Sequence, residues 1–265
     1  MDAPRHSLPP ALAVPSQPPW PGIGGALGLI ALYFVLQVVV GFATALLLGF
    51  GYRLLHGATA ADPVALLTRP DASSMVVIVT LLGAALGALW AVRARWPRLW
   101  SQAVPPGFGF AAPAAAYCVA AVALGLVVPL LGGKLTELLA HGHAVPQDVK
   151  QLGEGASTGF RIALTLVVAS IGPLVEELLF RGVLLSALLR HLRTAWAVLA
   201  SAALFALVHL PDLHWLWYAL PNLALLGVVL AWLRLRSGSL WPAVLAHAIN
   251  NLLAMLALFV SLAHQ

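Results

Sequence analysis

The feature that most limits how this chain can fold is a series of long apolar runs that together take up most of its 265 residues. Each run is about 20 residues long, which is the length that an α-helix needs to cross the apolar core of a membrane. Only 9% of the residues are charged, against roughly 25% in an ordinary soluble domain. A soluble globular fold and a disordered chain are therefore both excluded, since each needs more charge and less apolar surface.

The continuity of these runs decides between the two architectures that cross membranes. A β-barrel shows segments of about ten residues in which apolar and polar side chains alternate, and these runs do not alternate. The sequence therefore predicts an all-α, polytopic membrane helix bundle with about seven or eight transmembrane helices. The predicted spans are 23–52, 74–92, 110–132, 160–190, 194–210, 215–233 and 239–263. Gly172-Pro173 predicts a break in the fourth span, and an eighth span would result if the first were two elements.

Two regions of different composition divide the chain. Residues 1–22 are rich in proline and predict a flexible N-terminal tail, whereas residues 23–265 are predicted to form one transmembrane domain. The sequence pI near 10 does not indicate nucleic-acid binding, because the 14 basic residues form no dense patch. The predicted partners are therefore membrane lipid and a protein or peptide substrate, and not nucleic acid.

Charged residues in the predicted loops indicate the orientation of the bundle. The loops after the second, fourth and sixth spans contain arginines and no Asp or Glu, while the alternate loops contain the acidic residues. Loops rich in Lys and Arg remain on the cytoplasmic side. We therefore predict an integral, multi-pass protein of a bacterial inner membrane, with its N-terminus in the cytoplasm.

Six polar residues stand out because they fall well inside the predicted spans. They are Glu176, Glu177, Arg181, His209, His247 and Asn251. A charge at the centre of a bilayer costs about 2.5–3.5 kcal/mol even on the most lenient scale, and it is expected to have a partner and a function.

Helical spacing predicts how some of these side chains pair. Glu177 and Arg181 are four residues apart, share one helix face and are expected to form an ion pair. Glu176 points about 100° away around the same helix, which leaves it free for chemistry. Phe205 lies one helical turn before His209 and is expected to pack beside it.

Four of these residues, which come from three predicted helices, are expected to lie at similar depth in the membrane. At 1.5 Å per residue from the cytoplasmic ends of the spans, Glu176, His209, His247 and Asn251 all fall within roughly 10 Å of depth. The orientation was assigned from the loops alone, so this agreement is informative. We expect the four side chains to line one internal cavity.

The residue types in this cavity fit several functions. A carboxylate and an imidazole can act as general bases on water, while a second imidazole and a carboxamide can donate hydrogen bonds to an oxyanion. That set would serve a peptide hydrolase. Alternatively, Glu176, His209 and His247 could hold a Zn²⁺ that activates the water. A proton or ion relay in a transporter and a purely structural polar cluster also fit the spacing.

Three motifs in this order resemble a known family. They are Glu176-Glu177-x-x-x-Arg181, Phe205-x-x-x-His209 and His247-x-x-x-Asn251, and they are similar to motifs of the CPBP family, also called the Abi family. That family comprises CAAX proteases, including the type II CAAX prenyl endopeptidase, and bacteriocin-processing or bacteriocin-immunity proteins. The resemblance covers about residues 160–255 of the predicted 23–265 domain, whereas residues 1–159 match only as generic membrane helices.

The resemblance implies an intramembrane endopeptidase that cleaves a membrane-associated or lipidated protein or peptide, with prenylated substrates among those of the family. It implies that Glu176 and His209 activate water. His247 and Asn251 would stabilise the oxyanion. The residues that would support the site are Glu177, Arg181 and Phe205.

Two points stay open at this stage. Many family members are named metalloproteases, whereas the prenyl endopeptidase type resembles an enzyme that works through a glutamate without metal, so Zn²⁺ is one of two alternatives. Other members resemble non-catalytic membrane partners, immunity proteins or regulators. These functions, and less favourably a transporter, are the alternatives to a protease.

Overall fold

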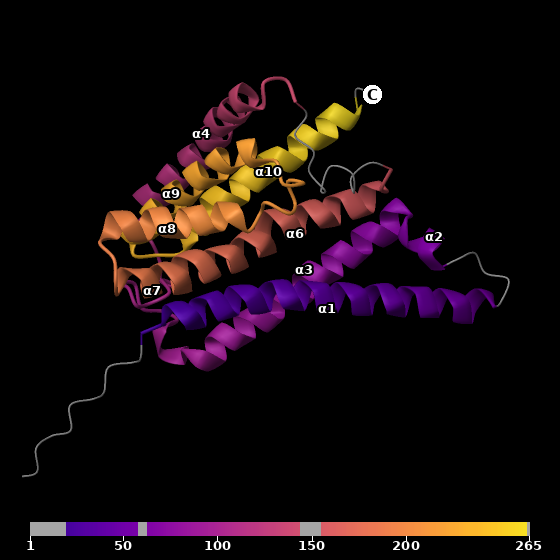
Figure 1. The fold of residues 1–265 in the computed structure, drawn as a ribbon, viewed down its shortest axis with the longest axis horizontal. Helices are drawn as coiled ribbons and strands as arrows, with labels where there is room; N and C mark the ends of the chain where they lie inside the picture. The colour runs from indigo at the N-terminus through magenta and orange to yellow at the C-terminus, as the bar shows by residue number, and fades with distance from the viewer. Residues whose placement is uncertain (1–19, 58–62, 144–154, 264–265) are drawn as a thin grey trace, which may run out of the picture.

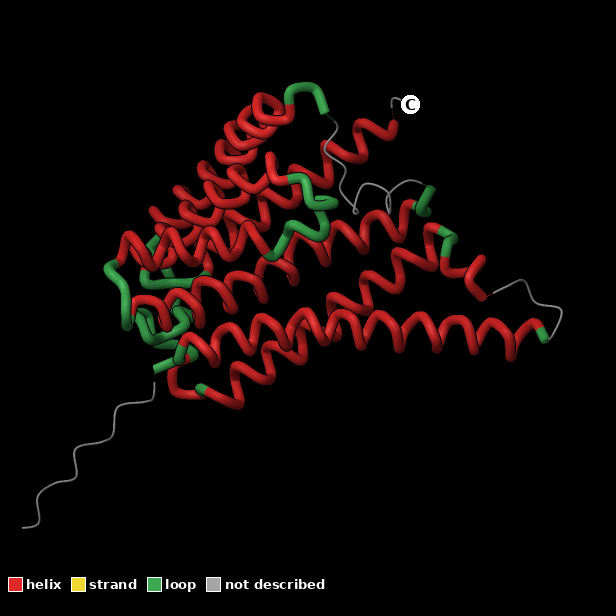
Figure 2. The backbone as a smooth tube through the Cα atoms, viewed as in Figure 1, coloured by secondary structure: helices red, strands yellow, loops and turns green. Residues whose placement is uncertain are grey.

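The computed structural model describes residues 20–57, 63–143 and 155–263. These residues form helices and no strand, so the predicted all-α membrane helix bundle is confirmed (Figures 1 and 2). The long helices are α1 (Ile23–His56), α3 (Pro70–Arg95), α4 (Ala115–Ala140), α6 (Thr158–Glu177), α9 (Leu220–Ser237) and α10 (Trp241–Ala263). The short ones are α2 (Pro63–Leu67), η1 (Pro97–Leu99), η2 (Leu178–Leu184), α7 (Leu185–Leu189), α8 (Thr194–Leu207) and η3 (Trp217–Ala219). Residues 1–19 of the predicted tail lie outside the described ranges.

Among the described residues, 6 apolar helical segments are long enough to cross a membrane. The predicted span at 194–210 is different, because α8 has only 14 residues and measures about 21 Å. This is shorter than the roughly 30 Å of a bilayer core. The first apolar run is one continuous helix of 34 residues and is not divided into two elements.

The break predicted at Gly172-Pro173 is wrong. Helix α6 continues through Pro173 to Glu177, since a proline removes one backbone donor but does not end a helix that its neighbours hold in place. The irregularity follows instead in η2, where Leu178–Leu184 form a π-helix in which all seven residues are buried. Wide turns of this kind are often found at functional sites.

The rod formed by α6, η2 and α7 runs through the middle of the molecule (Figure 1). Helices α1 and α3 cross each other on one side of it, and α4, α8, α9 and α10 cover the other side. Glycines allow close packing in the second group, because a Cβ on Gly227 of α9 would lie 2.9 Å from Ala202 of α8. A Cβ on Gly125 of α4 would similarly lie 2.8 Å from the Ala246 carbonyl oxygen of α10.

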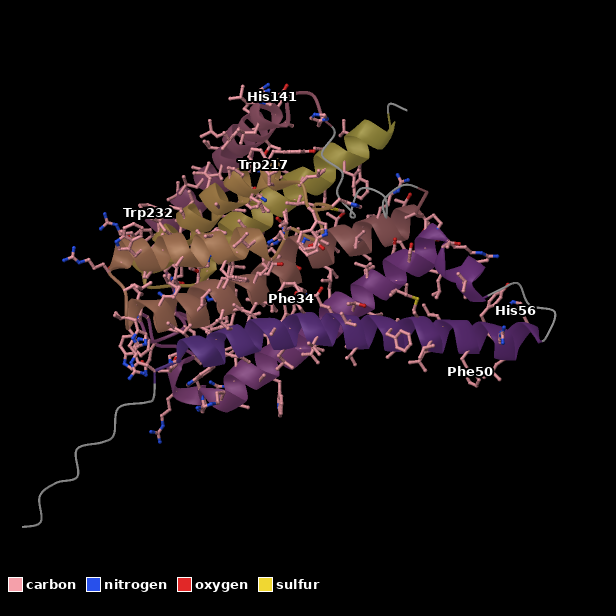
Figure 3. The ribbon with its side chains drawn as sticks, in the orientation of Figure 1. Phe34, Phe50, His56, His141, Trp217 and Trp232 are labelled. Atoms are coloured by element: carbon pink, nitrogen blue, oxygen red, sulfur yellow. The ribbon has the colours of Figure 1, made fainter. Side chains whose placement is uncertain are left out.

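Helix α1 extends beyond the densely packed part of the bundle. Phe34 lies in its N-terminal half, whereas Phe50 and His56 lie near its C-terminal end (Figure 3). The exposed fraction of Phe50 is 64%. Large apolar side chains with such exposure are expected on a surface that faces lipid.

Arg234, near the end of α9, joins two loops at one end of the bundle. It is completely buried, and it donates hydrogen bonds to the carbonyl oxygens of Ala103 at 2.8 Å and Gly107 at 2.6 Å. Gly109 adopts φ +80° beside the guanidinium, and its carbonyl oxygen accepts a bond from the Leu240 backbone N–H at 2.7 Å. Arg234 was predicted to lie in the loop after the sixth span, but it lies within α9. These bonds fix residues 97–111 to α9 and to the segment that begins α10.

Candidate active site

The predicted site residues come from three parts of the bundle that meet at η2. Glu176 and Glu177 are the last two residues of α6, and Arg181 lies in η2. His209 lies in the turn that follows α8. His247 and Asn251 are on α10. Because α8 ends early, its terminal turn brings a histidine to the interior of the bundle, where irregular backbone is tolerated if protein surrounds it.

Glu177 is the centre of a buried network. Its Oε1 accepts hydrogen bonds from Arg181 Nη1 at 3.0 Å and from His247 Nδ1 at 2.8 Å. The predicted ion pair is therefore present, and both of its side chains are fully buried. A buried pair needs further hydrogen bonds to offset desolvation, and Arg181 donates one more to the Gly227 carbonyl oxygen at 3.2 Å. Glu177 does more than was predicted, because it also orients a histidine of another helix.

Phe205 packs among the charged and aromatic groups of the site. Its ring centroid lies 4.8 Å from that of His209 and 5.6 Å from that of His247. The Arg181 guanidinium lies over the same ring at 4.2 Å, which is a cation–π contact. The carbonyl oxygen of Phe205 lies 2.7 Å from His209 Nδ1. The one-turn spacing to His209 thus produces the expected packing and also a hydrogen bond.

Hydrogen bonding fixes the tautomer of both histidines. His247 Nδ1 faces the Glu177 carboxylate, and His209 Nδ1 faces the Phe205 carbonyl oxygen. Both partners only accept hydrogen bonds, so the proton of each neutral imidazole is on Nδ1. Each Nε2 then presents a lone pair to the interior of the site.

Both of these lone pairs face Glu176. His209 Nε2 and His247 Nε2 each lie 3.8 Å from Glu176 Oε2. This distance is too long for a direct hydrogen bond, and Oε2 is buried without a hydrogen-bond partner. A contact longer than 3.5 Å between polar groups is one that a water can bridge. The three atoms therefore surround a place suited to one water molecule.

Exposure separates the residues of the site into two groups. The side chains of Glu176 and His209 are 21% and 25% exposed, whereas that of His247 is 4% exposed. Glu177 and Arg181 are fully buried. A substrate can therefore approach Glu176 and His209, while the other three residues are enclosed by protein.

Asn251 has two hydrogen bonds of its own. Its Nδ2 donates to the Val168 carbonyl oxygen at 3.1 Å, and its Oδ1 accepts from Asn250 Nδ2 at 3.1 Å. The first of these bonds holds α10 against α6. One amide N–H remains for another acceptor, and Asn251 lies one turn after His247 on the same helix.

The zinc alternative can be tested on the arrangement of the donors. Glu176, His209 and His247 are ligands of the kinds that zinc prefers. Yet in the described ranges no three His, Cys, Asp or Glu side chains are disposed as a group that could hold a metal ion. The zinc alternative therefore stays a prediction, and no step is derived through a metal.

Three further residues contribute to the site and were not predicted. Gly227 supplies a carbonyl oxygen to Arg181, and Ser201 donates to the Phe180 carbonyl oxygen of η2 at 3.1 Å while fully buried. Tyr33 of α1 is buried and interacts electrostatically with Glu176. A tyrosine and a serine within apolar spans are weak sequence signals, and a backbone carbonyl gives none.

The fold and these residues define a class: polytopic helical membrane proteins with a buried Glu–Arg–His network beside an accessible Glu–His pair. Residues 158–253 match the family model described as type II CAAX prenyl endopeptidase Rce1-like. Over 91 residues the chain is 32% identical to the "Putative membrane peptidase YdiL" of Bacillus subtilis (strain 168). No solved structure gives a significant match.

These matches confirm the resemblance drawn from the motifs and support the CPBP/CAAX protease family for the part of the chain that carries the site. Every predicted site residue, from Glu176 to Asn251, lies within 158–253. The similarity to the Bacillus protein covers 34% of this chain and 35% of that protein. The chain thus matches about a third of the length of this relative.

Proposed function

We propose that the protein is a membrane-embedded endopeptidase that hydrolyses a peptide bond in a membrane-associated or lipidated protein. The observation that supports this proposal most is the position of Glu176 Oε2. It is buried without a hydrogen-bond partner, and two imidazole nitrogens lie 3.8 Å away. The similarity of residues 158–253 to CAAX-type membrane peptidases supports the same class.

The first chemical step is the activation of water. A water between Glu176 Oε2 and His209 Nε2 would donate a hydrogen bond to each, because both atoms are acceptors. As the water oxygen bonds to the peptide carbonyl carbon, one of its protons passes to the Glu176–His209 pair, which acts as the general base. The same pair then returns this proton to the peptide nitrogen as the C–N bond breaks, so that an amine and a carboxylic acid are released. The partial exposure of these two side chains allows a peptide to reach this water.

The second requirement is stabilisation of the oxyanion. Neutral His247 has no proton on Nε2, so it donates to an oxyanion only as an imidazolium. Glu177 accepts from Nδ1 at 2.8 Å and would orient the His247 ring in the way that the aspartate of a catalytic triad orients its histidine. The second amide N–H of Asn251 would be the other donor, and each donor contributes through preorganised electrostatics.

The buried residues serve the reaction by holding these groups in place. Arg181 fixes Glu177, Glu177 fixes His247, and Phe205 packs against both histidines. A displacement of about 1 Å at such a site can reduce the rate roughly a hundredfold. Arg181, Glu177 and Phe205 are therefore proposed to position the reacting groups and not to take part in making or breaking bonds.

The proposed substrate reaches the site from the membrane. One matching family model is described as a prenyl endopeptidase, so a peptide with a prenylated cysteine is the first substrate to test. Arginines gather in three segments, at 93–98, 190–193 and 234–236, and positive charges of this kind favour the cytoplasmic side of a membrane. We propose that the N-terminus is on that side of a bacterial inner membrane.

The test uses the full chain purified in detergent. Cleavage of peptides with and without a prenyl group is compared for the wild type, Glu176→Gln and His209→Ala. Glu137→Gln is the matched control, because Glu137 pairs only with exposed Lys134. Loss of at least a hundredfold in rate for the two site variants is expected for general bases.

Equal cleavage by all four proteins would overturn the proposal. A deletion phenotype that Glu176→Gln rescues as well as the wild type would instead favour a non-catalytic membrane partner or immunity protein. Substrate-dependent flux into liposomes would favour a transporter.

A further inference from the structure

A groove at one end of the bundle lies apart from the Glu176 site. It runs between the first turns of α1 and the last turns of α3, which lie side by side in Figure 1. Its volume is about 690 Å³, within the range of about 300–1,000 Å³ that is usual for ligand pockets. The lining includes Gly22, Gly25 and Gly28 of one wall and Trp90, Arg95 and Trp96 of the other.

The glycines leave one wall of this groove without side chains. Gly22, Gly25 and Gly28 are three residues apart and share a face at the start of α1. A Cβ on Gly22 or Gly28 would meet no atom within 4 Å, and one on Gly25 would meet only the Trp96 ring, at 3.7 Å. At Gly22 and Gly28 this face is therefore open to an apolar chain, and at Gly25 it lies beside the Trp96 ring.

Trp96 provides a polar group without a partner. The residue is 5% exposed, and its Nε1 is buried with no hydrogen-bond acceptor. The ring edge formed by Cη2 and Cζ2 lies beside Gly25, 3.7 and 3.8 Å from the position that a Cβ would take, and Nε1 is two covalent bonds from Cζ2 along that edge. A buried donor of this kind is expected to find an acceptor, and an oxygen of a ligand in the groove would be one.

Among the described residues, the charged side chain that lines the groove is Arg95. Arg95 is exposed and lies over the Trp96 ring at 5.2 Å. No Asp or Glu occurs between Asp71 and Glu137. A ligand that is complementary in charge is therefore an anion with an apolar tail.

We propose that this groove binds an acidic phospholipid. Its acyl chain would lie along the glycine face, and its phosphate would accept hydrogen bonds from Arg95 and from Trp96 Nε1. Tryptophan and arginine together are typical of the level of lipid headgroups, and the cytoplasmic leaflet carries anionic lipids that attract Lys and Arg. The groove contains none of the predicted site residues, so the inference does not depend on the peptidase.

The experiment measures lipid retention by native mass spectrometry of the full chain in detergent. Phosphatidylglycerol and phosphatidylcholine with the same acyl chains are added at equal concentrations. The wild type is expected to retain phosphatidylglycerol about fivefold more strongly than phosphatidylcholine, which is the preference that one basic residue near a surface provides. Arg95→Ala removes this preference, and Gly25→Leu, which fills the groove, reduces retention of both lipids.

Matched controls separate this site from lipid bound around the whole bundle. Gly24→Leu places the same side chain in open space outside the lining, and Arg98→Ala removes an exposed charge that does not line the groove. Both controls should retain lipid as the wild type does. Equal retention by all five proteins would mean annular lipid only and would overturn the proposal, as would a wild type without preference between the two lipids.

Discussion

Glu176 and Glu177 are neighbours in the chain but belong to opposite environments. Glu177 is fully buried and bonded to two partners, whereas Glu176 is partly exposed and its Oε2 has no hydrogen bond. Two hydrogen bonds on Oε1 hold the Glu177 carboxylate in place, whereas the Glu176 Oε2 faces two imidazole nitrogens at 3.8 Å and can accept a proton from a water between them. The C-terminal end of α6 therefore supplies both a residue that supports the site and a residue proposed to carry out its chemistry.

The largest loss of stability is expected when Arg181, the ion-pair partner of Glu177, is replaced. Arg181→Met leaves Glu177 buried without its ion-pair partner, and removing one member of a buried pair destabilises by about 3–5 kcal/mol. Thermal unfolding followed by tryptophan fluorescence would measure the loss. Arg190→Met is the matched control, because Arg190 is exposed and should change stability little. Equal unfolding temperatures for the two variants would show that the network does not support the fold.

A smaller effect is expected where the network meets α9. Gly227→Ala places a methyl group 2.9 Å from Ala202 and displaces the carbonyl oxygen that accepts from Arg181. Such overpacking typically destabilises by about 1–3 kcal/mol. Gly51→Ala, at a helix position with no atom within 4 Å, should not destabilise. An unfolding temperature of Gly227→Ala equal to that of the wild type would contradict the close packing of α8 and α9.

The smallest effect is expected from removing metal ions. Because the described His and Glu donors do not form a metal-holding group, chelation followed by dialysis should leave the cleavage rate unchanged. The metal content of the purified protein is measured in parallel. Loss of activity that Zn²⁺ restores would place Glu176, His209 and His247 in a metal centre and would replace the water mechanism proposed above.

The parts of this molecule that depend on nearby residues were predictable from the sequence. The apolar runs located the membrane helices, and the four-residue spacing located the Glu177–Arg181 pair. The third span was displaced, since Pro113 lies before the start of α4 at Ala115 and the helix continues through Gly132 to Ala140. Glycines in apolar surroundings do not end a membrane helix that neighbouring helices enclose.

The parts that depend on packing between helices were not predictable. The bond between Glu177 and His247 joins residues 70 positions apart, and no local pattern contains that information. The same is true of Gly227, which contributes only a backbone oxygen. Pro173 shows the converse, because its local signal predicted a break that the surrounding helices override.

Exchanging one oxygen for nitrogen in each of the two glutamates tests the division of roles between them most directly. Cleavage rate and unfolding temperature are measured side by side for Glu176→Gln and Glu177→Gln. Glu176→Gln is expected to lose at least a hundredfold in rate with an unchanged unfolding temperature, whereas Glu177→Gln should lower the unfolding temperature as well as the rate. A Glu176→Gln protein that cleaves at the wild-type rate, or that unfolds as early as Glu177→Gln, would contradict the assignment.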